Sequence, residues 1–204
     1  MTEPTRFVEV ERKFDVDAGT PLPRWTDVPG VAAVSPGERR HLDALYLDTA
    51  DLALARAGVA VRRRIGGPDA GWHVKGPLVD GARVELGWPL GEGDEVPDAV
   101  RTELAAYTSD ALEPLARIVN DRTAYELLDA RGGVLAEFVD DHVRAHDLRA
   151  GTERAWHEWE IELGPAAPAG AAREEFFAAV TDAALAAGAR GASSASKLAR
   201  ALGR

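Results

Sequence analysis

The chain has 204 residues, a formal net charge of −10 and no cysteine, which excludes disulfides, thiolate metal sites and cysteine nucleophiles. Hydrophobic residues make up 46% and charged residues 28%, a composition typical of folded rather than disordered proteins. The acidic balance argues against nonspecific nucleic-acid binding, and no apolar run approaches membrane-spanning length. We therefore expect a cytoplasmic protein without nucleic-acid or membrane partners.

Short alternating stretches separated by turn residues predict a mainly β protein. The expected strands are residues 7–14, 41–48, 59–65, 72–75, 83–90, 122–128, 134–141, 142–148 and 155–163. Clusters of Gly, Asp and Pro, such as GGPDAG at 66–71, lie between several of them and are typical of hairpins. This spacing predicts an antiparallel barrel or sandwich.

Four stretches have helical features: residues 51–57, 98–119, 171–187 and 193–202. In the second, Leu104, Leu115 and Val119 recur at helical intervals, although Pro114 interrupts the pattern. Residues 164–170 form a linker by composition. The length favours one domain, and we expect it to cover residues 1–204.

Charged side chains gather on one face of several predicted strands, because a strand sends alternate residues to opposite faces. The ordinary interpretation is the solvent-exposed face of an antiparallel sheet. However, like charges stand two residues apart in pairs such as Glu9 with Glu11 and Arg62 with Arg64. They repel unless a counter-charge lies between them. A cation beside the carboxylates and a polyanion beside the arginines would supply it, which predicts a barrel with an ionic interior.

These residue types in combination indicate phosphate chemistry. Arg and Lys bind phosphoryl oxygens, and Arg does so through two parallel hydrogen bonds. Glu and Asp bind Mg²⁺ or Mn²⁺, which prefer oxygen ligands and keep several waters.

The order of the charged motifs resembles the CYTH, or triphosphate tunnel metalloenzyme, family. The matching motifs are EVERK at 9–13, YLDT at 46–49, VRRR at 61–64, WHVKGP at 72–77, RVEL at 83–86, EFVDD at 137–141, EWEIEL at 158–163 and SASK at 194–197. The resemblance covers about residues 6–202. It implies a mainly β fold with flanking helices (α+β), in which a closed eight-stranded antiparallel barrel forms a polar triphosphate tunnel.

The resemblance also implies roles for individual residues. Those expected in catalysis are Glu9, Glu11, Lys13 and Tyr46. Those expected to bind substrate are Lys13, Arg62, Arg64, Lys75, Arg83, Arg122 and Lys197. Those expected to hold or support Mg²⁺ or Mn²⁺ are Glu9, Glu11, Glu85, Glu137, Asp141, Glu158, Glu160 and Glu162. For Tyr46, simple packing within its strand is the alternative.

Other residues depart from the family pattern or are expected to be passive. Where many members have RxExE, this chain has RVELG at 83–87, so Gly87 stands in place of the second carboxylate. In residues 117–125, only Arg122 aligns with a basic residue of the family. His73 is expected at the rim or in a supporting place, and residues 38–40 in a solvated charge run. The remaining histidines have no metal-ligand spacing and are expected on the surface: His41, His142, His146 and His157.

The predicted function is divalent-metal-dependent hydrolysis of a triphosphate, most readily inorganic triphosphate. Thiamine triphosphatase or class IV adenylate cyclase activity is the alternative within the family, and a noncatalytic polyphosphate-binding module is the alternative outside enzymes. Related domains are often fused to a helical phosphate-binding domain, for which 204 residues leave no room. The sequence leaves a homodimer open.

Overall fold

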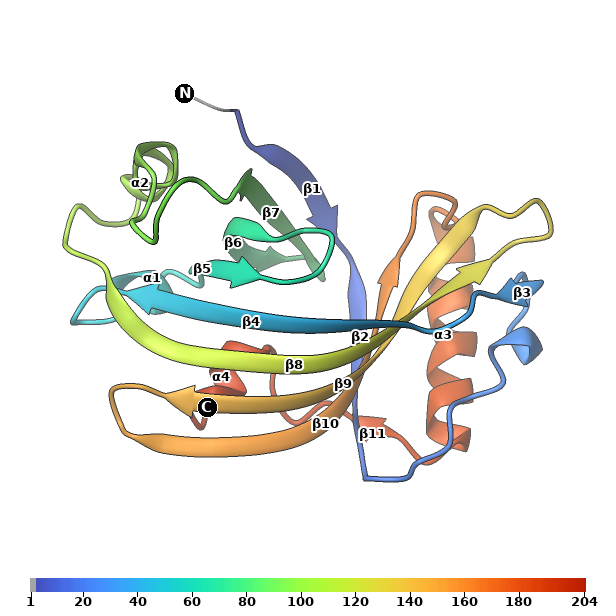
Figure 1. Ribbon diagram of the computed structural model, residues 1–204. Coiled ribbons are helices and arrows are strands. Elements are labelled where there is room, and N and C mark those ends of the chain that lie inside the picture. Colours follow the sequence, from blue (N-terminus) through green and yellow to red (C-terminus); the bar gives the residue numbers. More distant parts are fainter. Residues whose placement is uncertain (1–2) are drawn as a thin grey trace.

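The computed structural model describes residues 3–204 and shows an antiparallel β structure with a few helices (Figure 1). The strands are β1 (Thr5–Glu9), β2 (Glu11–Val16), β3 (Ala33–Val34), β4 (Glu38–Asp48), β5 (Ala60–Ile65), β6 (Gly71–Val79), β7 (Ala82–Pro89), β8 (Glu113–Leu128), β9 (Val134–Asp147), β10 (Thr152–Leu163) and β11 (Arg190–Gly191). The helices are α1 (Ala53–Arg56), α2 (Asp98–Leu104), α3 (Ala171–Ala186) and α4 (Lys197–Ala201), with a 3-10 turn at Trp25–Asp27.

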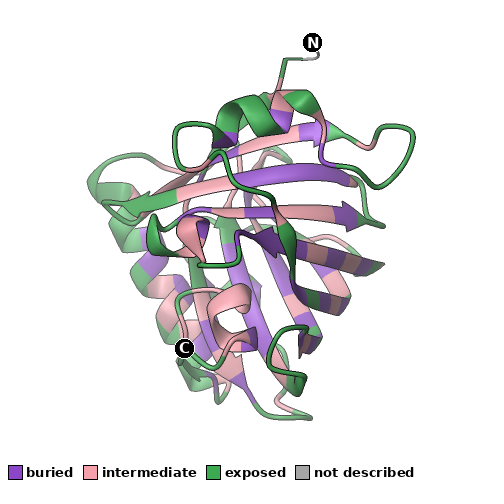
Figure 2. Ribbon diagram, turned by 90° about the vertical axis from the view of Figure 1, so that its left-hand side faces the viewer, coloured by how far each residue is buried: buried purple, intermediate pink, exposed green. Residues whose placement is uncertain are grey.

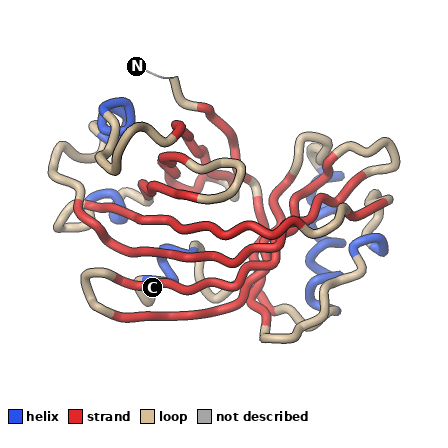
Figure 3. The backbone as a smooth tube through the Cα atoms, in the orientation of Figure 1, coloured by secondary structure: helices blue, strands red, loops and turns tan. Residues whose placement is uncertain are grey.

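All the strands belong to one curved sheet, in the order β1-β7-β6-β5-β4-β8-β9-β10-β2-β11, with β3 beside β8. The four long strands β4, β8, β9 and β10 run side by side across the molecule (Figure 3). The expected closed eight-stranded barrel is therefore wrong on two counts. The sheet has eleven strands, and its hydrogen-bonded order is open, because β1 pairs with β7 while β2 pairs with β10.

The single strand expected at 7–14 is divided at Val10, where the chain changes partners. Glu9 lies opposite Arg83 of β7, whereas Glu11 lies opposite Glu162 of β10. The carbonyl oxygen of Val10 accepts a hydrogen bond from the Leu163 amide at 3.0 Å. The covalent chain at Val10 thus connects β1, next to β7, with β2, next to β10, although β1 and β2 are not paired with each other.

Two further boundaries differ from the prediction. The helix expected over 98–119 ends at Leu104, and β8 begins at Glu113. Beyond Pro114, the inward residues Ile118 and Asn120 follow the two-residue period of a strand. Pro114 has no amide hydrogen to donate, and it lies where the pairing of β8 with β4 is irregular. The strands expected at 134–141 and 142–148 are one strand, β9, because no turn residue separates them.

Apolar clusters on the outer face anchor the helices, and buried residues are concentrated along the strands (Figure 2). Trp159 and Phe138 of the sheet pack with Phe176 of α3, while Trp72 and Trp88 pack with residues of α1 and α2. These tryptophans thus pack under helices. Within residues 3–204, no helix combines the length and apolarity needed to cross a bilayer.

Candidate active site

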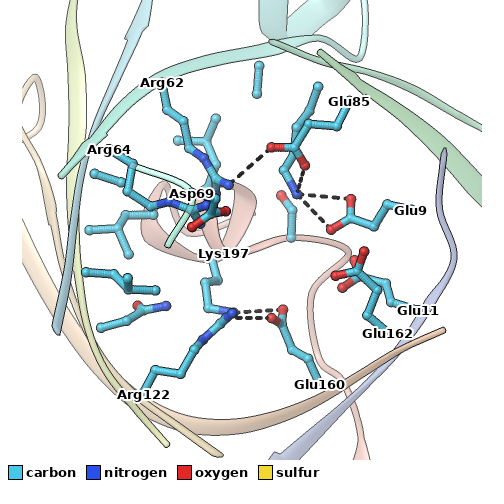
Figure 4. A pocket seen from close by; sticks show the side chains of 18 of the residues that line it. Glu9, Glu11, Arg62, Arg64, Asp69, Glu85, Arg122, Glu160, Glu162 and Lys197 are labelled. Atoms are coloured by element: carbon cyan, nitrogen blue, oxygen red, sulfur yellow. Dashed lines mark hydrogen bonds and ion pairs between the residues drawn. The ribbon is translucent and has the colours of Figure 1, made fainter. Parts of the chain in front are cut away.

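The inward face of the curved sheet lines a pocket of about 340 Å³ (Figure 4). The predicted site residues that line it are Glu9, Glu11, Lys13, Tyr46, Arg62, Arg64, Lys75, Arg83, Glu85, Arg122, Glu137, Glu160, Glu162 and Lys197. Asp141 and Glu158 do not line it and instead contact the Lys197 ammonium from behind. The chain's three lysines, Lys13, Lys75 and Lys197, all lie in this pocket.

The charges in the pocket are separated by sign. Figure 4 shows Glu9, Glu11 and Glu162 together on one side, with Arg62 and Arg64 on the other. The acidic side comes from β1, β2 and β10, and the two arginines come from β5. A ligand in the pocket would therefore meet the two arginines on one side and, on the other, carboxylates accompanied by Lys13 and Lys75.

One group of carboxylates, Asp141, Glu158 and Glu160, is already neutralised by basic residues; we call it the closed group. The Lys197 Nζ lies 2.9 Å from Asp141, 2.5 Å from Glu158 and 2.7 Å from Glu160. Ser196 caps the N-terminus of α4 by accepting a hydrogen bond from Ala199 N.

The guanidinium of Arg122 completes the closed group. It donates to both Asp141 oxygens at 2.8 and 2.7 Å and to Glu160 at 3.1 Å. Lys13 also contacts Glu160. Although burial opposes ionisation, the charges of Lys13, Lys197 and Arg122 hold the pKa of Glu160 well below its usual range.

Glu85 is held in a similar way in the middle of the pocket. Its carboxylate lies 2.7 Å from His73 Nδ1, 2.9 Å from Lys75 Nζ and 3.3 Å from an Arg62 nitrogen. Against the effect of burial, these partners hold its pKa far below the usual range. Lys75 also donates to both oxygens of Glu9, at 2.8 and 3.0 Å. Buried His73 is thus a direct support of Glu85 and is not at the rim.

The second group of carboxylates, Glu9, Glu11 and Glu162, is only partly neutralised; we call it the open group. Lys75 is paired with Glu9, and the Lys13 Nζ lies 2.8 Å from Glu11. Glu11 and Glu162 are directly opposite each other in the pairing of β2 with β10. Within residues 3–204, Glu162 has no ion-pair partner. Desolvation in the pocket and the charges of Glu9 and Glu11 raise its pKa to about 7. Burial and the charge of Glu160 also raise the pKa of Glu11.

The open group fits a hard divalent cation better than the closed group does. The closed group has ligand atoms within 4.8 Å of one another, but ammonium and guanidinium groups occupy the space between them. The open group offers carboxylate oxygens, the donors that Mg²⁺ and Mn²⁺ prefer, and its like charges gain from a counter-ion. Among the other expected metal ligands, Glu137 accepts from Arg40 at 3.0 Å.

The cationic side of the pocket has spare hydrogen-bond donors. Within residues 3–204, the buried Nε–H groups of Arg62 and Arg64 have no acceptor, and the same is true of Arg40 and Arg83 elsewhere in the pocket wall. Buried donors without an acceptor are unfavourable and call for a ligand or water. Burial and the neighbouring charges of Arg62 and Arg122 lower the pKa of Arg64 to about 9, so this side is short of anions.

Tyr46 combines packing with a polar contact. Its ring belongs to the apolar cluster that includes Ile118 and Val143, while its hydroxyl accepts from Arg62 at 3.2 Å. Burial opposes ionisation of the phenol, but the charge of Arg62 outweighs it and lowers the pKa of Tyr46.

The sequence interpretation missed three residues of the pocket wall, Arg40, Asp69 and Asn120. Arg40, expected to be solvated, points inward and donates to Glu137. Its position two, four and six residues before the inward-facing Leu42, Ala44 and Tyr46 was the available signal. Asp69 comes from the loop at 66–71 and contacts Arg64, which no pattern in the sequence indicates.

The family model of the CYTH domain matches residues 8–201. The chain belongs to the CYTH domain family. This confirms the resemblance inferred from the motifs. Two uncharacterized proteins of Mycobacterium tuberculosis, from strains CDC 1551 and H37Rv, are each 39% identical to it over 98% of its length. The chain spans 41% of the length of each of these relatives.

Solved structures share the fold of this CYTH chain at low sequence identity. A candidate adenylate cyclase of Bacillus halodurans superposes with a TM-score of 0.60 at 18% identity, covering 96% of this chain and 97% of the other. A candidate adenylyl cyclase of Hippeastrum, described as having a dominant triphosphatase activity, gives 0.52 at 17% identity, covering 96% and 95%. The PH1819 protein of Pyrococcus horikoshii gives 0.53 at 16% identity, covering 96% of each chain.

Proposed function

We propose that this CYTH domain binds a triphosphate-containing substrate in the pocket and hydrolyses its terminal phosphoanhydride bond in the presence of Mg²⁺ or Mn²⁺. Inorganic triphosphate is the substrate that we expect first. The observation that carries the proposal is the separation of charge, with unsatisfied arginine donors on one side and the open group on the other. Family membership supports it, and so does the triphosphatase activity described for the Hippeastrum protein.

The cationic side has the chemistry to hold a chain of phosphoryl groups. Arg62 and Arg64 extend from the same face of β5, and each has a buried N–H group without an acceptor in residues 3–204. A phosphate oxygen would accept these hydrogen bonds and would restore the depressed pKa of Arg64 by supplying negative charge. A nucleoside or thiamine group would have to extend beyond these arginines.

The open group, Glu9, Glu11 and Glu162, would hold the divalent ion. Bound there, Mg²⁺ or Mn²⁺ would neutralise phosphate oxygens and lower the pKa of a coordinated water. The proposed hydrolysis forms a bond from water oxygen to the terminal phosphorus and breaks the bond to the bridging oxygen. The products are orthophosphate and the shortened phosphate chain, so no covalent enzyme intermediate is needed.

Two residues of the pocket wall are proposed to manage charge and protons. Burial favours the neutral amine of Lys13, but Glu160 and Glu11 outweigh it and raise the pKa of the ammonium. Lys13 therefore stays charged and stabilises negative charge that develops on the phosphate. Tyr46 carries a phenol with a lowered pKa beside Arg62, which suits it to donate a proton to the leaving oxygen.

A substrate panel tests the proposal. The purified chain is incubated with inorganic triphosphate, thiamine triphosphate, ATP or long-chain polyphosphate, each with Mg²⁺, with Mn²⁺ or with a chelator, and released phosphate is measured. We expect metal-dependent release that is fastest with inorganic triphosphate. The matched control is Glu153→Gln, which changes an exposed glutamate of β10 outside the pocket and should leave the rate unchanged.

Product analysis separates the alternatives. A cyclase would convert ATP to cyclic AMP and pyrophosphate. Formation of cyclic AMP without orthophosphate would therefore identify a cyclase and contradict the proposed hydrolysis. Tight binding of polyphosphate without any metal-dependent release would instead identify a binding module. The chain spans only 41% of the length of the Mycobacterium tuberculosis relatives, so the same product analysis should also be carried out on one of them.

A further inference from the structure

A row of polar residues crosses the outer face of the sheet, on the opposite side from the pocket. His41 of β4 is opposite Asp121 of β8, Asp121 is opposite His142 of β9, and His142 is opposite His157 of β10. These residues point outward because their sequence neighbours point inward. For example, Asp141 and Glu158, which adjoin His142 and His157, contact Lys197 on the pocket side.

Three side chains meet at one end of this row. Asp140, His142 and His157 each offer a ligand atom, and these atoms all lie within 4.8 Å of one another. The two imidazole rings are stacked with centroids 4.0 Å apart and an angle of 19° between their planes. Asp140 and His142 are two residues apart on β9 and share its outer face, while His157 comes from β10.

The surroundings orient two of these side chains and leave the third free. Asp140 Oδ1 accepts from Trp159 Nε1 at 2.9 Å and from His157 Nε2. The other His157 nitrogen, Nδ1, is buried and has no hydrogen-bond partner within residues 3–204. His142 is exposed, so its ring can turn toward the other two.

We propose that Asp140, His142 and His157 form a binding site for a divalent transition-metal ion, with Zn²⁺ as the main occupant. Two imidazole nitrogens and one carboxylate oxygen are a common zinc donor set, whereas Mg²⁺ prefers oxygen alone. At zinc–ligand distances of about 2.0–2.2 Å, tetrahedral ligand atoms lie roughly 3.4 Å apart. Rotation of the exposed His142 ring closes the remaining gap, and water completes the coordination.

The ion would replace the proton shared by His157 and Asp140 and would tie β9 to β10 from outside. At the same level, Lys197 ties Asp141 of β9 to Glu158 of β10 from inside. The metal therefore has a structural effect at this place: it binds the folded sheet and not the separated strands. Binding to the folded state alone raises the stability of the protein.

Calorimetric titration of the full chain with Zn²⁺ in excess Mg²⁺ tests the site, because Mg²⁺ competes for carboxylate sites in the pocket but not for imidazoles. We expect one Zn²⁺ per chain and a higher melting temperature with Zn²⁺. The variants His142→Ala and His157→Gln should weaken binding by at least about tenfold. His41→Ala is the matched control, since it removes an exposed histidine of the same row and should bind Zn²⁺ as the wild type does.

The visible absorption of bound Co²⁺ gives a second readout, since its intensity distinguishes a tetrahedral site from an octahedral one. The band should be present in the wild type and in Glu11→Gln but absent in His142→Ala. Unchanged Zn²⁺ binding in both histidine variants would overturn the proposal, as would binding that is lost in Glu11→Gln or is undetectable in the wild type. Exposed His142 can be replaced without disturbing the core, so its variant remains informative if His157→Gln unfolds.

Discussion

Glu160 and Glu162 are two residues apart on the same face of β10, yet their surroundings are opposite. Glu160 contacts Lys13, Arg122 and Lys197, which hold its pKa well below the usual range. Glu162 faces Glu11 and has no ion-pair partner in the described chain, and its pKa is raised to about 7. The comparison teaches that neighbouring strands, and not the motif, decide what each glutamate can do.

The difference extends to the two groups to which these residues belong. In the closed group the cations are part of the protein, so its carboxylates contribute to the folded structure. In the open group Glu9 is paired with Lys75 and Glu11 with Lys13, while Glu162 has no ion-pair partner in the described chain, so this group gains most from a bound cation. Variants in the two groups should therefore affect different measurements.

The largest effect is expected for Lys197→Met, which removes the ammonium from the closed group while keeping most of the length of the side chain. Asp141, Glu158 and Glu160 would lose a shared partner at 2.5–2.9 Å in a buried place. Breaking one partner of a buried ion pair costs about 3–5 kcal/mol of unfolding free energy. Urea denaturation without metal or substrate measures it. A cost below about 1 kcal/mol would contradict a structural role for the closed group.

The next effect is the loss of catalysis in Glu11→Gln. It removes one charge from the open group but keeps the shape of the side chain. We expect kcat/KM for inorganic triphosphate with Mg²⁺ to fall at least about 100-fold, because a metal ligand matters no less than its supporting contacts. Glu9→Gln should behave alike, and Glu153→Gln should not. Full turnover in either pocket variant would refute the assignment of the open group.

A pH effect of about tenfold is expected from Glu162. Its pKa of about 7 means that the carboxylate is protonated in mildly acidic solution, so Mg²⁺ affinity should fall about tenfold per pH unit below 7. Calorimetry at pH 6, 7 and 8 measures this dependence. In Glu162→Gln it should be much weaker, and an equally steep dependence would show that another group is responsible.

The same shift has a consequence for metal-free protein. The folded state raises the pKa of Glu162 above the ordinary value of 4.5, so it binds this proton more tightly than the unfolded state does. Stability from this group is present at low pH and is lost as the pH rises from about 4.5 through about 7. Glu162→Gln should therefore become relatively more stable than the wild type at pH 8, as denaturation at several pH values would show.

The smallest effect is expected for Asp69→Asn. The Asp69 carboxylate contacts Arg64 and competes with a phosphate for its guanidinium. Exposed ion pairs contribute about 0–1 kcal/mol, so KM for triphosphate should fall about two- to fivefold. The control is Asp94→Asn, which removes the pair of Asp94 with Arg63, a residue outside the pocket. Unchanged KM in Asp69→Asn would mean that Asp69 does not compete.

The sequence predicted which strand faces carry charge, because alternation is a local property that survives folding. It did not predict the partner change at Val10, which depends on the pairing of β1 with β7 and of β2 with β10. It also predicted a helix across the beginning of β8. There Leu115 and Val119 repeat at helical spacing, but pairing with β4 and β9 makes the segment a strand.

Within the site, the sequence indicated the residue types but not their partners. Glu160 and Glu162 look alike in EWEIEL, and they are distinguished by the residues around them: Lys13, Arg122 and Lys197 beside Glu160, and Glu11 opposite Glu162. His142 and His157 lack any ligand spacing along the chain, yet the pairing of β9 with β10 makes them direct neighbours. Contacts of this kind depend on strand register, which cannot be deduced from the spacing of residues within a single strand.

The location of all three lysines in one pocket has a practical consequence. Arginine supplies every other formal positive charge on the side chains, so amine-directed acylation has no lysine target elsewhere in the chain. A decrease in lysine acylation when a ligand is added therefore reports on this pocket alone.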